Sequence, residues 1–170
     1  MKAIKFFAVA ILFSGVSVIS SAQVKATATA SSTIVTPIGI TKTVDMNFGN
    51  VAINSTTAGT VVLAPAGTRT STGGVTLPAT AGTVAAAEFN VTGANNYTFS
   101  ITLPSTSHEI KSGSNTMSVT GFTSTPTPTG TLSATGSATV KVGATLNVSA
   151  GQAAGTYTSV TPFEVTVNYN

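Results

Sequence analysis

The sequence predicts an all-β protein built from two packed antiparallel sheets. Apolar and polar residues alternate with a period of two in several short segments, which is the spacing of a strand with one buried face. Turn residues separate these segments at intervals of roughly 8–12 residues, as in β-sandwiches. After the N-terminal segment, no long stretch repeats apolar residues at helical spacing. A closed barrel is the alternative arrangement of the same strands.

The N-terminus predicts a cleaved secretory signal peptide over residues 1–22. Lys2 and Lys5 precede a mostly apolar stretch from Phe6 to Ile19, and small residues then stand before the expected cleavage site at Gln23. This stretch is shorter than the roughly 20 apolar residues that a membrane-spanning helix needs. We therefore expect export through the inner membrane, to the periplasm, the cell surface or the extracellular space.

The composition excludes several classes of function. Charged residues make up only 6% of the chain, against about 25% in an average domain, so the surface is expected to be neutral and rich in hydroxyl groups. The basic residues are scattered, whereas nucleic-acid binding needs a basic patch. The chain has no cysteine, which rules out disulfides, thiolate metal sites and a lipoprotein anchor.

Residues 23–170 are expected to form a single domain. Its first residues can be interpreted in two ways. Val24, Ala26, Ala28 and Ala30 share the even positions of one segment, and this phase continues past Pro37. The segment is either the first strand of the sandwich or, over residues 23–33, an extended N-terminal arm that seeks a sheet edge elsewhere.

The middle of the chain reads as a series of short strands. Residues 59–65 and 73–79 are short β-branched runs ended by proline. Residues 87–92 and 97–103 alternate in period two around the turn residues of "GANN", which predicts a hairpin.

Three further features are expected towards the C-terminus. Residues 115–122 alternate and then change phase at Gly121, which suggests a bulge. Residues 123–136 are rich in proline and threonine and read as a surface loop. Residues 140–148 form another alternating strand, in which Gly143 marks a second possible bulge.

The closing stretch "TPFEVTVNYN" predicts a final strand with one apolar face. Its apolar residues occupy the odd positions, with Glu164, Thr166 and Asn168 between them. One edge of this strand is expected to pair inside the sandwich, and its other edge is expected to be either protected or the place where a partner adds a strand. The predicted interaction residues are therefore those of its apolar face: Phe163, Val165, Val167 and Tyr169.

The chain offers little chemistry for catalysis or metal binding. Its ionisable candidates are His108 and four scattered carboxylates, and adjacent residues such as His108 and Glu109 point to opposite faces of a strand. No nucleophile motif accompanies the many serines. We predict that the protein is not an enzyme and has no catalytic residues, cofactor or metal site. Tyr97, Tyr157 and Tyr169 share the apolar phase of their strands, which favours core or rim positions over a sugar-binding platform.

Several segments together resemble a bacterial secreted family known as domain of unknown function 4402. They include "TIVTPIGITKTVDMNFGNV", "AEFNVTGANNYTFSITLPS" and "GTLSATGSATVKVGATLNVSAGQAAGTY". The resemblance implies an Ig-like β-sandwich of Greek-key type and an exported location. More distantly, the ending "GTYTSVTPFEVTVNYN" is similar to spore coat protein U and to chaperone–usher pilus subunits. That similarity implies a closing strand, with penultimate Tyr169, that is held by a chaperone or completed by a neighbour's arm.

The expected function is that of a non-enzymatic structural or adhesive protein of the bacterial envelope or extracellular matrix, including a fimbrial-type subunit. Its partners would be other surface subunits, copies of itself or a periplasmic chaperone, bound by edge-strand pairing. A monomeric secreted module that binds glycans is the alternative.

Overall fold

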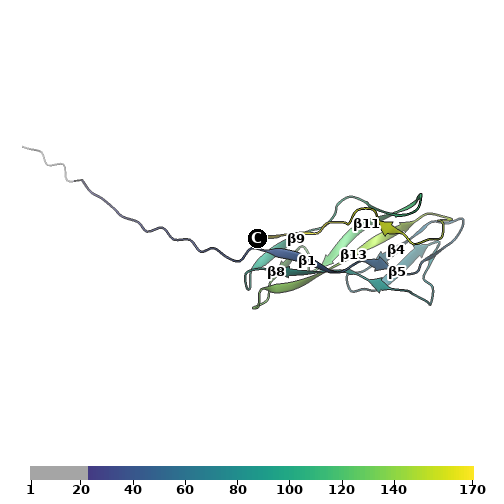
Figure 1. Ribbon diagram of the computed structural model, residues 1–170, viewed down its shortest axis with the longest axis horizontal. Coiled ribbons are helices and arrows are strands. Elements are labelled where there is room, and N and C mark those ends of the chain that lie inside the picture. The colour runs from purple at the N-terminus through teal and green to yellow at the C-terminus, as the bar shows by residue number, and fades with distance from the viewer. Residues whose placement is uncertain (1–22) are drawn as a thin grey trace, which may run out of the picture. The chain divides into compact units, whose positions relative to one another are not determined.

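A computed structural model describes residues 23–170, and the predicted signal peptide lies outside them. Ile34–Asn170 form one compact unit, and the residues before Ile34 belong to a second. Residues 23–33 are exposed and contain no strand, so regular structure begins at Gly39. The described chain is all-β (Figure 1). None of its segments is a helix of the length and apolarity that a bilayer crossing requires.

The larger sheet is antiparallel and is organised around β13. Strand β13 pairs with β11 along one edge, while its other edge pairs first with β8 and then with β4. The sheet contains β1 (Gly39–Val44), β8 (Ala87–Thr92), β13 (Ser137–Val148), β11 (Asn115–Thr125), β10 (His108–Ser112) and β14 (Thr158–Ser159), with β4 (Gly59–Leu63) and β5 (Arg69–Gly73) as a branch.

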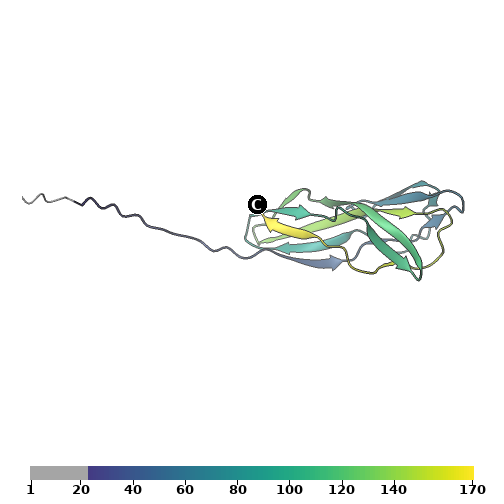
Figure 2. The ribbon, with the colours of Figure 1, turned by 90° about the horizontal axis from the view of Figure 1, so that it is seen from above.

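A smaller sheet covers part of the same core (Figure 2). It has the order β12 (Thr129–Thr131), β9 (Thr98–Thr102), β15 (Thr166–Tyr169). Two short pairs complete the structure: β2 (Asn47–Phe48) with β7 (Val84–Ala85), and β3 (Ala52–Ile53) with β6 (Val75–Thr76). The predicted antiparallel, Ig-like β-sandwich is confirmed.

The core consists of two apolar clusters that β13 connects. Val140 and Val142 belong to the first cluster, which also receives residues of β8, β9 and β15. Leu146 and Val148 belong to the second, with residues of β4 and β11. The alternation predicted over residues 140–148 is therefore the alternation of buried and outward residues in this strand. Such close packing of aliphatic residues provides most of the stability of a fold without disulfides.

Gly143 lies between the part of β13 that pairs with β8 and the part that pairs with β4. A Cβ atom there would collide with the carbonyl oxygen of Leu63, so the glycine serves a close backbone approach and not the bulge suggested for it. The bulge expected at Gly121 is confirmed, because the register of β11 with β13 shifts between Thr120 and Thr123.

Two local predictions are wrong. Residues 87–92 and 97–103 do not form a hairpin: β8 lies in the large sheet and β9 in the small one. The intervening turn is held instead by the loop before β13, through backbone bonds from Gly93 to Gly136 and from Asn96 to Ser133. The predicted loop over residues 123–136 contains the end of β11 and all of β12, which finds its partner in β9.

Candidate interaction site

The C-terminal segment keeps the predicted alternation of exposed and covered residues. Val167 is buried, Phe163, Val165 and Tyr169 are half-buried against the first core cluster, and the residues between them are exposed. The segment thus contributes one apolar face to the core and one polar face to solvent, as period-two spacing requires.

The ladder in this segment is shorter than the sequence suggests. The strand predicted from Phe163 begins only at Thr166, which pairs with Thr102 at the end of β9. Beyond Thr102 the chain leaves the ladder at Leu103 and Pro104, so no strand lies opposite residues 163–165. Pro162 also lacks an N–H group for a ladder bond. Residues 162–165 therefore have no strand pairing within the described part of the chain, and they follow a bend at residues 160–161.

Strand β15 is an edge of the small sheet, and β1 is an edge of the large one. Within residues 23–170, β15 pairs only with β9, and β1 pairs only with β8. The two strands contact each other without forming a ladder. Each consequently has one edge of backbone N–H and C=O groups without strand partners.

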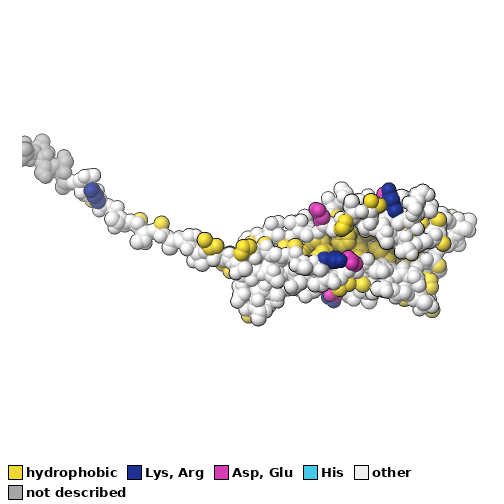
Figure 3. All heavy atoms as spheres, viewed as in Figure 1, with side chains coloured by type: hydrophobic (Ala, Val, Ile, Leu, Met, Phe, Trp, Pro, Cys, Tyr) yellow, Lys and Arg dark blue, Asp and Glu magenta, His cyan; other side chains and the backbone are white. Residues whose placement is uncertain are grey.

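A hollow lined by apolar side chains separates the C-terminal segment from β1 (Figure 3). The first core cluster is incompletely covered on both sides of this hollow. Its half-buried residues include Ile38, Ile40 and Met46 from the β1 side and Phe163 and Val165 from the C-terminal side. The hollow is an opening between the two sheets through which these half-buried residues, and not the buried core cluster itself, reach solvent.

Lys42 stands on the core-facing side of β1. It lies opposite Phe89, which in turn lies opposite Val140, and residues opposite one another in a ladder share a face of the sheet. Its Nζ binds both carboxylate oxygens of Asp45 at 2.8 Å. Its side chain is 51% exposed, so the charge lies at the surface beside the hollow, and a charged residue on an edge strand protects against unwanted pairing. The sequence analysis missed this residue, although it falls in the even phase of Ile38 and Ile40.

Tyr169 fixes the end of β15 to two other segments. Its hydroxyl donates to the carbonyl of Thr36 at 2.7 Å and accepts from the N–H of Ala94 at 2.6 Å. Its ring meets that of Tyr97 edge to face, with the centroids 5.5 Å apart. A side chain at Gly93 would collide with the tyrosine hydroxyl. Period-two spacing predicts the inward direction of Tyr169 but not these partners.

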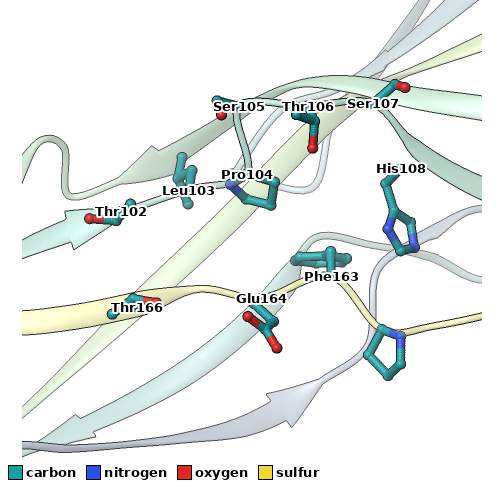
Figure 4. A pocket seen from close by; sticks show the side chains of 11 residues that line it. Thr102, Leu103, Pro104, Ser105, Thr106, Ser107, His108, Phe163, Glu164 and Thr166 are labelled. Atoms are coloured by element: carbon teal, nitrogen blue, oxygen red, sulfur yellow. The ribbon is translucent and has the colours of Figure 1, made fainter.

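A cleft of about 380 Å³ opens where β9 and the C-terminal segment diverge (Figure 4). It lies between residues 102–108 and 162–166. On its floor, the rings of His108 and Phe163 meet edge to face at 6.0 Å. His108 Nε2 lies 3.0 Å from Ser159 Oγ, which fixes the imidazole against β14.

Most of the charged groups in the described chain are paired at the surface. Asp45, Glu88 and Glu109 form ion pairs with lysines, and Glu164 is the remaining carboxylate. His108 and Glu109 lie on opposite faces of β10, as predicted, because their ladder partners are Val119 and Ser118. No cluster of three potential metal ligands occurs within residues 23–170.

Comparison with known proteins adds one match. The family described as a domain of unknown function, DUF4402, matches residues 38–169 and so covers the sandwich from just before β1 to the end of β15. Neither a curated protein nor a solved structure matches the chain significantly.

Proposed function

Because this chain belongs to the DUF4402 family, whose function is unknown, we propose a function from its geometry. The protein is an exported, non-enzymatic structural protein of the bacterial envelope or extracellular matrix. It acts as a fimbrial-type subunit that associates by accepting a β-strand from a partner. The observation that carries the proposal is the pair of neighbouring free edges, on β1 and β15, with half-buried apolar residues between them.

An added strand would cover both the unpaired backbone groups at the edge of β15 and the apolar side chains that line the hollow. Its backbone would bind the free edge of β15, while every second side chain would enter the hollow and cover the first core cluster. Covering apolar surface contributes roughly 25 cal/mol for each Å² removed from water. Main-chain bonds give such a contact strength, and the alternating side chains set its register.

The N-terminal arm of a second copy can supply this strand. Residues 23–33 are exposed and free of secondary structure, and their even positions carry Val24, Ala26, Ala28 and Ala30. The small side chains suit a shallow hollow. The odd positions carry Lys25 and hydroxyl residues, which would remain in solvent.

The experiment compares the mature chain, residues 23–170, with residues 34–170, the compact unit defined above. Light scattering after size exclusion is expected to show oligomers that depend on the arm. Ala28→Asp, in the apolar phase, should weaken them, whereas Thr27→Asp, in the polar phase, should not. Equal oligomers without the arm would refute its role. If both proteins are monomers and a synthetic peptide of residues 23–34 does not bind to residues 34–170, the proposal that the sandwich accepts a strand is refuted.

A further inference from the structure

We propose that the cleft between residues 102–108 and 162–166 binds a neutral saccharide. The cleft shares Phe163 with the hollow and Thr166 with β15, but its existence does not depend on the function proposed above. Its volume of about 380 Å³ is within the range of small-molecule sites. The cleft has an apolar floor, a hydroxyl-rich rim and a single carboxylate.

The floor of the cleft offers an aromatic ring beside two prolines. Phe163 packs against Phe122, with ring centroids 5.1 Å apart, and against Phe89 at 6.4 Å. These contacts hold the ring in place on the core side, while the same residue lines the cleft with Pro104 and Pro162. A sugar ring carries C–H groups on its faces, and such a face covers an apolar, aromatic surface well.

The rim supplies hydrogen-bonding groups of the kind that sugar hydroxyls need. Figure 4 shows the Thr106 side chain directed from the loop towards Phe163, and four more hydroxyl residues line the cleft: Thr102, Ser105, Ser107 and Thr166. None of the backbone hydrogen bonds outside the strands involves residues 103–107 or 160–165. Apart from Pro104 and Pro162, which have no N–H group, these residues can offer backbone groups to a ligand, and the His108 ring is fixed in place through Ser159.

The charge of the cleft favours a neutral ligand. Its lining contains no lysine or arginine, and its one carboxylate, Glu164, belongs to none of the ion pairs in the described chain. A carboxylate accepts hydrogen bonds from hydroxyl groups but repels an anion. An acidic sugar should therefore bind less well than its neutral counterpart.

The test uses the mature protein, residues 23–170, and a set of neutral methyl hexopyranosides. Saturation-transfer NMR and backbone amide shifts are expected to show binding with a Kd on the order of 1 mM, with shifts confined to residues 102–108 and 162–166. For the sugar that binds, the uronic acid of the same ring should bind at least about tenfold more weakly, a difference of roughly 1.4 kcal/mol.

Matched variants separate this site from the rest of the surface. Thr106→Val keeps the shape and removes the hydroxyl, and should weaken binding while leaving arm-dependent oligomers unchanged. Thr60→Val makes the same change on β4, outside the cleft, and should have no effect on sugar binding. The proposal is overturned if no neutral hexopyranoside binds, if the amide shifts lie elsewhere, or if the two variants behave alike.

Discussion

Tyr169 illustrates how one side chain can close a fold that has no disulfide. Its hydroxyl connects β15 to the segment entering β1, through Thr36, and to the turn after β8, through Ala94. The contact with Thr36 spans 133 positions of the chain. A hydroxyl that both donates and accepts ties the first and last strands of the sandwich to the same point.

Tyr169→Phe should therefore lower the free energy of unfolding by about 1–2 kcal/mol, because the ring stays and the Ala94 N–H loses its partner. Chemical denaturation of the two proteins measures the difference. Tyr97→Phe is the matched control: this ring packs on Tyr169 but is 46% exposed, and its hydroxyl should contribute little. Equal losses from the two variants would contradict the role given to the Tyr169 hydroxyl.

At the scale of the element, β15 is a short edge strand that depends on its buried face. Val167 is only 7% exposed and belongs to the first core cluster, whereas its neighbour Asn168 is exposed. Within residues 23–170 the strand is paired on one side alone, so few backbone bonds add to the contribution of this side chain.

Val167→Asp should cost about 2–5 kcal/mol, since it places a charge without a partner in the apolar layer. Asn168→Asp adds the same carboxylate on the solvent side and should change stability by less than about 0.5 kcal/mol. Thermal or urea unfolding measures both. A Val167→Asp protein as stable as the parent, and able to assemble, would refute the burial of this face.

Strand β1 differs from β15, because one position of its apolar face is occupied by the charged residue Lys42. Lys42→Val should raise self-association, because it removes the charge beside the hollow and extends the apolar surface there. Thr41→Val adds the same side chain to the outer face, opposite Asn90, and serves as control. Light scattering over a range of concentrations compares the two. A Lys42→Val protein that associates no more than the control would remove the protective role assigned to Lys42.

At the scale of the whole molecule, stability should decrease from β13 towards the free edges. Strand β13 is paired on both sides and contributes to both apolar clusters. Strands β1 and β15 are each paired on one side. Segments with few buried contacts and exposed backbone bonds open most readily.

Native-state hydrogen exchange of residues 34–170 is expected to follow this order. Amides of β13 should exchange slowest, near the rate set by global unfolding, and those of β15 among the fastest of the strands. Addition of a peptide of residues 23–34 should slow exchange in β15 and leave β13 unchanged. Exchange in β15 as slow as in β13 without peptide would mean that this edge is already covered.

The sequence alone determined the class of fold and the direction of most strand side chains. Period-two alternation is a local property, so it predicted which residues of 140–148 and 163–169 face inwards. The phase change at Gly121 likewise located a bulge. Composition was enough to exclude disulfides, because the sequence has no cysteine.

Only the tertiary structure decided which strands pair, and with it the candidate site. Alternation is the same for strands in one sheet or in two, so residues 87–92 and 97–103 read as a hairpin although they belong to different sheets. The start of β15 depends on where β9 ends, and the roles of Lys42 and Tyr169 depend on residues far along the chain. Pairing of this kind is fixed by packing between distant segments, which no local pattern contains.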